Sequence, residues 1–145
     1  MEYLKIMILS MIPVTELRGA IPIGIAMDLN PTRVYIVSVL GATLVSIPLI
    51  LTFRHIINFF RGISMFEGLV KTIDKKIDLG MKRLKNVSIL GIIIFVGVPL
   101  PTTGTWTASA IASILKMRLT TALLGVLLGN MMSGIIVSAL ALHII

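Results

Sequence analysis

The chain has 145 residues, of which 57% are hydrophobic and 13% charged, and its formal net charge is +7. Soluble globular domains carry about 25% charged residues, so this composition excludes that class and indicates an integral membrane protein. Cysteine is absent, which excludes disulfides and thiolate metal sites. No polar stretch is long enough to build a separate soluble domain. We therefore expect a single membrane domain over residues 1–145.

The chain begins with two short apolar arms around a break. Residues 4–14 and 17–29 would give helices of roughly 16–20 Å, against about 30 Å of hydrocarbon in a bilayer. Pro13 ends the first arm because proline cannot donate to the helix and clashes with the preceding turn. Thr15 is predicted to cap the second arm, which also contains Pro22.

A turn and a long apolar stretch follow these arms. Residues 28–32 read as a turn, with Thr32 as the predicted N-cap of the next helix. Residues 34–53 are continuously apolar and long enough to span a membrane, with Pro48 as an expected kink. The first half of the chain, residues 1–53, thus combines a broken segment with one spanning helix.

The central segment, residues 54–86, is strongly basic. It contains eight basic and three acidic side chains, a net charge of +5. Apolar residues recur every three or four positions over 64–85, which predicts an amphipathic helix on an anionic leaflet. Basic segments between membrane helices are typical of the cytoplasmic face, so we expect residues 54–86 to be cytoplasmic. Because this location accounts for the basic charge, we expect no nucleic-acid partner.

The second half, residues 87–145, repeats the order of the first. Residues 87–98 are a short apolar arm, 99–104 a break, 105–115 a second arm and 119–142 a spanning run. When Pro13 is aligned with Pro99, Ile25-Ala26 aligns with Ile111-Ala112. Leu40-Gly41 aligns with Leu128-Gly129 when two residues are inserted. We interpret this order as an internal duplication.

Two topologies are compatible with the duplication. If each broken segment returns to its own side, each half crosses once and the halves are inverted. If each broken segment spans, there are four crossings and the halves are parallel. With residues 54–86 cytoplasmic, only the re-entrant topology also places Lys116 and Arg118 in the cytoplasm, so the positive-inside rule favours it.

Paired interrupted segments in corresponding positions indicate a transporter's binding site. Arg18 lies in the first break, and two half-helix N-termini at membrane depth would bind an anionic group beside it. Glu16 could neutralise Arg18, take up a coupling proton or hold a cationic substrate. A structural Glu16–Arg18 ion pair that pins the break to backbone carbonyls is the competing interpretation.

The second break is rich in hydroxyl groups, which could line a polar path or serve helix packing. Trp106 could anchor at the interface or close the cavity. No nucleophile–base pair or metal-ligand cluster is recognisable, so we expect no enzyme activity, cofactor or metal. The predicted substrate-binding residues are Thr15, Arg18, Gly19, Thr102, Thr103, Gly104, Thr105 and Trp106, and the predicted helix breaks are Pro13, Pro22, Pro99 and Pro101.

The two breaks resemble the signatures of the small multi-drug export protein family. The similarity lies in ELRGAIP over residues 16–22 and in VPLP, TG and WT over residues 98–107. Thr102 and Ala108 stand where the family pattern has glycine. The layout is also similar to the DedA-like superfamily, which has two re-entrant hairpins and is tied to moving lipids or lipid-phosphate carriers. That superfamily keeps an arginine in its second motif, and none lies over residues 99–115.

We therefore expect an all-α membrane protein of two inverted repeats, each a re-entrant hairpin plus one transmembrane helix. The predicted function is transport of a small amphipathic and anionic molecule, with Glu16 as the proton-coupling acid. We expect the protein to be a multi-pass protein of the cell membrane. The alternatives are a DedA-like lipid or lipid-carrier flippase and a non-transporting structural or assembly protein. Besides the lipid bilayer, the expected partners are the substrate and a second copy of the chain.

Overall fold

The computed structural model describes residues 1–69, 71–72, 75 and 89–144. These residues form helices and no strands, which confirms the predicted all-α class. The elements are α1 (Glu2–Met11), α2 (Glu16–Ala26), α3 (Pro31–Arg61), a 3₁₀ turn η1 (Ser64–Phe66), α5 (Thr105–Ile114) and α6 (Leu119–Ile144), and residues 89–97 are also helical.

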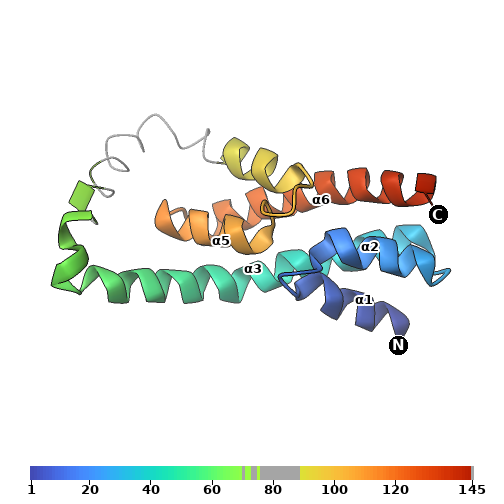
Figure 1. Ribbon diagram of the computed structural model, residues 1–145, viewed down its shortest axis with the longest axis horizontal. Helices are drawn as coiled ribbons and strands as arrows, with labels where there is room; N and C mark the ends of the chain where they lie inside the picture. The colour runs from blue at the N-terminus through green and yellow to red at the C-terminus, as the bar shows by residue number, and fades with distance from the viewer. Residues whose placement is uncertain (70, 73–74, 76–88, 145) are drawn as a thin grey trace.

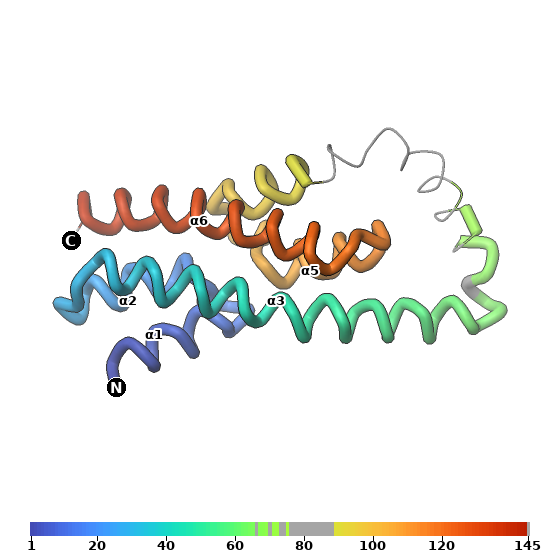
Figure 2. Tube along the Cα trace, turned by 180° about the vertical axis from the view of Figure 1, so that it is seen from behind, coloured from blue at the N-terminus to red at the C-terminus, as the bar shows by residue number. Residues whose placement is uncertain are grey.

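The two long helices, α3 and α6, run side by side in opposite directions (Figures 1 and 2). Both are long and apolar enough to cross a membrane. α1 and α2 form a hairpin beside the end of the bundle where α3 starts and α6 finishes. The helix over 89–97 and α5 form a second hairpin toward the other end (Figure 1). The connections inside the two hairpins therefore meet near the middle of the molecule.

The start of α3 differs from the prediction. Asn30, not Thr32, is the N-cap, and its Oδ1 accepts hydrogen bonds from the backbone N–H groups of Thr32 at 3.1 Å and Arg33 at 3.3 Å. Pro31 occupies the first helical position, where its missing N–H is not needed. The turn was placed correctly, but the capping residue precedes the proline.

α3 also continues beyond the predicted apolar run, as far as Arg61. Residues 54–61 therefore belong to the helix and not to the basic linker. The apolar run stops where charge appears, but a helix can continue into the polar region outside the hydrocarbon. Residues 67–69, 71–72 and 75 are helical, and the rest of the amphipathic helix predicted over 64–85 lies outside the described residues.

Pro13 and Pro22 have different effects on the helices. Pro13 follows directly after α1, which ends at Met11, so the break predicted there is present. Pro22 lies inside α2, which continues to Ala26, and the helix break predicted at Pro22 is therefore wrong. A helix within a membrane bundle tolerates proline because neighbouring groups can satisfy the freed backbone carbonyl.

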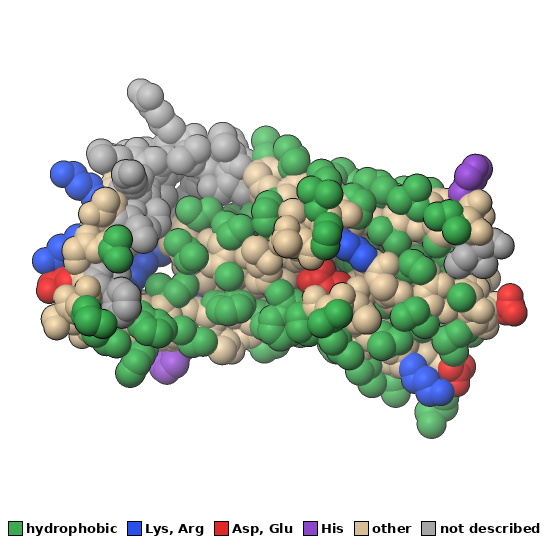
Figure 3. Space-filling view, viewed as in Figure 1, with side chains coloured by type: hydrophobic (Ala, Val, Ile, Leu, Met, Phe, Trp, Pro, Cys, Tyr) green, Lys and Arg blue, Asp and Glu red, His purple; other side chains and the backbone are tan. Residues whose placement is uncertain are grey.

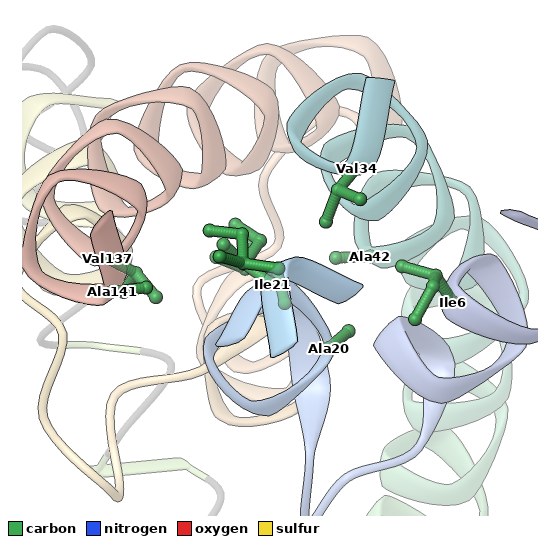
Figure 4. Packing of buried hydrophobic residues seen from close by; sticks show 9 residues of the cluster. Ile6, Ala20, Ile21, Val34, Ala42, Val137 and Ala141 are labelled. Carbon is green, nitrogen blue, oxygen red and sulfur yellow. The ribbon is translucent and has the colours of Figure 1, made fainter. Parts of the chain in front are cut away.

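Two apolar clusters hold the bundle together, one for each hairpin. In the first, Ile6 and Ile21 of the first hairpin pack against Val34 of α3 and Val137 of α6 (Figure 4). In the second, Val96 and α5 pack against Ile50, Val126 and their neighbours. Each hairpin is therefore anchored on both long helices.

Two glycines allow close approach of each long helix to the first arm of a hairpin. A Cβ at Gly41 would lie 2.7 Å from the Met7 carbonyl oxygen, and a Cβ at Gly129 would lie 3.1 Å from the Ile93 carbonyl oxygen. Met7 and Ile93 are corresponding positions when Pro13 is superposed on Pro99. The same close contact thus occurs at matching places in the two halves.

Substitution of Gly41 by alanine is expected to destabilise the protein by about 1–3 kcal/mol, because the added methyl group meets a backbone carbonyl. Gly91, in the helix over 89–97, is the matched control, since its Cβ would meet nothing within 4 Å. Gly91→Ala is expected to stabilise by about 0.4–1 kcal/mol. Chemical unfolding of the detergent-solubilised variants measures both effects, and equal stabilities would contradict the close packing at Gly41.

Charged side chains gather at the two ends of the molecule, while hydrophobic side chains cover most of its length (Figure 3). One acidic and one basic group also lie side by side near the middle of this face (Figure 3). Charge at membrane depth is costly, so a central charged pair is a candidate functional site.

Candidate functional site

A cavity of about 390 Å³ lies where the two breaks meet. It brings together seven predicted functional residues and one neighbour from both halves of the chain. The lining consists of Pro13, Val14, Thr15, Glu16, Arg18 and Gly19 from the first break and Pro99 and Pro101 from the second. The two segments that the sequence singled out therefore form one site.

Arg18, in the first turn of α2, reaches across to the second break. Its Nη2 donates to the carbonyl oxygens of Val96 at 3.1 Å and Thr103 at 2.8 Å, and to that of Val98 at 3.4 Å. Its Nη1 donates to the carbonyl oxygen of Leu100. The guanidinium thus binds one helix C-terminus and the loop after it, where carbonyl groups lack intrahelical partners.

A further contact ties Arg18 to a long helix. Its Nε lies 3.5 Å from the Oγ of Ser133, which is buried on α6. All three guanidinium nitrogens are therefore directed to protein acceptors. In this arrangement the guanidinium stabilises the second break rather than presenting free donors to the cavity.

Glu16, the first residue of α2, has a backbone φ of 45°. Left-handed conformations are unfavourable for residues other than glycine, and in functional sites they cost about 1–3 kcal/mol. The bend directs the carboxylate to the N-terminus of α5, where the backbone N–H groups of Thr105 and Trp106 hydrogen-bond to it. Its Oε2 lies 4.0 Å from Nη1 of Arg18, and both side chains are largely buried.

Gly104, the residue before α5, is what lets the carboxylate approach so closely. A Cβ at this position would lie 2.0 Å from Oε1 of Glu16. The conformation of Gly104 is ordinary extended backbone, so the need for glycine here is one of space. Glu16 consequently occupies the helix N-terminus that was predicted to be open for a substrate anion.

The predicted threonine caps are right in position only for Thr15. Thr15 is the N-cap residue of α2, but its hydroxyl donates to the Leu9 carbonyl oxygen at 2.6 Å and makes no capping hydrogen bond. Neither Thr102 nor Thr103 caps α5, whose N-cap residue is Gly104. Thr103 instead donates to the Val98 carbonyl oxygen at 2.7 Å and stiffens the loop that binds Arg18. Thr102 is exposed.

Trp106 connects the two breaks from the other side. Its indole Nε1 donates to the carbonyl oxygen of Met11, the last residue of α1, at 3.1 Å. This contact satisfies one of the carbonyl groups that a helix end leaves free. Trp106 is therefore part of the contact between the hairpins, and it does not line the cavity at the breaks.

The hydroxyl groups of α5 mostly serve packing. Ser109 donates to the Thr105 carbonyl oxygen at 2.7 Å, and Ser113 donates to that of Ser109 at 2.8 Å. The Thr105 hydroxyl donates to Oδ1 of Asn130 at 3.1 Å, and Nδ2 of Asn130 donates to the Thr43 hydroxyl at 3.1 Å. This buried chain links α5, α6 and α3 directly behind the Glu16 contact.

Sequence reasoning missed the partners of the charged pair. Ser133 lies in an unremarkable apolar run, and no sequence signal identifies it as an Arg18 contact. Gly104 was among the predicted substrate-binding residues, but in the structure it gives the Glu16 carboxylate space at the N-terminus of α5. Within the described residues, no group of three or more His, Asp or Glu side chains is placed to hold a metal ion.

The sequence profile of the family described as "Putative small multi-drug export protein" matches residues 16–136, which include Glu16, Arg18 and the whole second break. No curated protein and no solved structure shows significant similarity to the chain. The family's description names export and no enzyme activity, and together with the two long apolar helices it indicates a membrane protein. The chain belongs to the small multi-drug export protein family.

Proposed function

We propose that this protein is a membrane transporter whose substrate binds in the cavity between the two breaks. The observation that carries the proposal is that this cavity is lined by a largely buried Glu16 and Arg18 at the meeting point of two interrupted segments. Buried charge is expensive in a membrane protein and marks substrate or proton pathways. The export activity in the family's description is consistent with this use of the cavity.

The arrangement of the hairpins supports a re-entrant, inverted topology. Both arms of each hairpin lie toward the same end of the bundle, and the two hairpins lie toward opposite ends (Figure 1). The matched contacts of Gly41 and Gly129 support a duplication. In this topology α3 and α6 are the two crossings of the cell membrane and residues 54–86 face the cytoplasm. The homodimer remains a prediction.

Glu16 is the proposed coupling acid because its charge holds the two hairpins together. The carboxylate lies against the N-terminus of α5 and 4.0 Å from Arg18. Proton uptake removes the negative charge, so both attractions weaken. The N-terminus of α5, and the positive charge of Arg18 that Glu16 had neutralised, then become available to another anion.

This exchange defines the substrate class and the coupling. An anionic group of a small amphipathic molecule takes the place that the Glu16 carboxylate leaves. Substrate and proton therefore bind together, move in the same direction and are driven by the sum of their two gradients. A cationic substrate would instead compete with the proton for the carboxylate, and the two would move in opposite directions.

The sequence contains no cysteine, so a single introduced cysteine can be labelled specifically to test the cavity. Val14 lines the cavity and is 91% exposed, so Val14→Cys accepts a bulky maleimide at the mouth of the site. In reconstituted vesicles with an imposed pH gradient, the probes are an amphipathic anion, 8-anilinonaphthalene-1-sulfonate, and an amphipathic cation, ethidium. Labelling is expected to stop gradient-driven movement of the anion.

The matched control is Met65→Cys, which is 81% exposed and lies outside the cavity lining. The labelled control is expected to transport as well as the unlabelled protein. Equal transport by both labelled variants would contradict the placement of the substrate path. Movement of ethidium against the proton flow would contradict the substrate class, and no flux of either probe would contradict transport.

A non-transporting structural role is the second candidate, because a specific observation favours it. The Arg18 guanidinium is surrounded by protein acceptors, as expected of a group that only holds the loop in place. The same contacts serve the transporter in its closed state. Glu16 distinguishes the transporter from the structural protein, because a carboxylate with a purely structural role would not couple proton movement to substrate transport.

A further inference from the structure

A second cavity, of about 230 Å³, lies between the C-terminal part of α3 and the end of α5. Among the residues that the structure describes, it shares none of its lining with the cavity at the breaks. Three of its lining side chains are cationic, and none in the described part of the lining is acidic. The described lining consists of Arg54, Ile57, Asn58, Arg61, Ser113 and Lys116.

Arg54 has an unsatisfied edge. Its Nε and Nη2 are shielded from solvent, and neither has a hydrogen-bond partner. Buried donors without an acceptor are rare in proteins and cost free energy, more so when the group is charged. Nε–H and the adjacent Nη2–H point in the same direction, so this edge is the fork that binds two oxygens of one phosphate or carboxylate.

The geometry points to a phosphate-binding site in this cavity, with Arg54 as its principal ligand. Arg54 lines the cavity, and the bidentate edge of its guanidinium has no acceptor in the protein. Asn58 contributes a neutral amide donor to the same wall. The site is independent of the proposed transport, because it shares no residue with the cavity at the breaks.

The size and position of the cavity limit the ligand. Pockets for drug-sized molecules have volumes of about 300–1,000 Å³, so 230 Å³ suits a headgroup better than a whole drug molecule. The site lies near the C-terminal end of an apolar helix long enough to span a membrane, and four of its six described lining residues belong to the basic segment 54–86. Basic pockets of this kind bind phospholipid headgroups. A lipid phosphate and a free phosphate ion both supply the required chemistry.

The test is native mass spectrometry of the full-length protein in detergent, titrated with phosphatidylglycerol. Arg54→Gln is expected to weaken binding about tenfold or more, because it removes a charged, bidentate donor. Asn58→Asp is a second variant that keeps the shape of the side chain and adds a carboxylate to the cavity wall. It is expected to weaken lipid binding even if Arg54→Gln does not fold.

The matched control is Arg33→Gln, which removes an exposed arginine from the opposite end of the same helix. Its affinity for phosphatidylglycerol should equal that of the wild type. Unchanged affinity in both cavity variants, or an equal loss in the control, would overturn the site. Added inorganic phosphate identifies the source: displacement of the lipid shows that free phosphate suffices, and retention shows that the lipid headgroup is required. Either result, with the variant effects, supports phosphate binding.

Discussion

Replacement of Arg18 by leucine is expected to lower the free energy of unfolding by about 3–5 kcal/mol, the range for removing one partner of a buried charged network. The carbonyl oxygens of Val96 and Thr103 would lose their guanidinium donor, and Glu16 would lose its nearest positive charge. Buried acceptors left without a partner carry their full desolvation cost. This contact network makes Arg18 the most destabilising single substitution that the site offers.

Chemical unfolding in detergent, followed by circular dichroism, measures the loss. Arg33→Leu is the matched control, because Arg33 is exposed at the start of α3 and its change should cost less than about 1 kcal/mol. Arg18→Lys keeps the charge but cannot reach several carbonyl groups at once, so an intermediate stability is expected. Wild-type stability in Arg18→Leu would show that the guanidinium does not hold the second break.

The second large effect is expected for Glu16→Gln in reconstituted vesicles. The amide keeps the shape of the side chain but cannot release a proton, so it resembles the protonated state permanently. Stimulation of anion movement by a pH gradient should fall about tenfold or more, within the usual range of coupling between two ligands. Binding of the anion should persist. Undiminished proton-driven flux would exclude Glu16 as the coupling acid.

Gly104→Ala reaches the same carboxylate without changing its chemistry. The added Cβ would lie 2.0 Å from Oε1 of Glu16, so the side chain must leave the N-terminus of α5. We expect a pH response that is weakened in the same direction as in Glu16→Gln. Gly91→Ala should transport normally, because its Cβ meets no neighbour. Full coupling in Gly104→Ala would argue against a role for the contact between Glu16 and α5.

Hydropathy and proline positions predicted the helices well but placed several helix ends less accurately. Length and hydropathy identified two helices capable of spanning a membrane, and Pro13 and Pro99 marked the two interruptions. The end of α3 was missed because hydropathy reports where a membrane segment stops, whereas Arg61 and Gly62 mark where the helix stops. The break expected at Pro22 failed because proline disfavours a helix without forbidding it inside a bundle.

The residues of the site were predictable, but most of their contacts were not. Charge in an apolar context was enough to single out Glu16 and Arg18. Their partners are backbone groups more than 75 residues away in sequence, and peptide carbonyls carry no sequence signal. The sequence analysis considered Glu16 as a partner of Arg18, but it did not predict that the Glu16 carboxylate would lie at the N-terminus of α5. Glu16 satisfies α5 just as an external ligand would.

The two apolar clusters have a consequence for local stability. Each lies toward one end of the bundle and anchors one hairpin on both long helices. Between them the hairpins meet largely through hydrogen bonds of Arg18, Glu16 and Trp106. Few buried apolar contacts and exchangeable polar ones are typical of regions that open at low free energy. The contact between the two hairpins is therefore expected to open at a lower free energy than either apolar cluster.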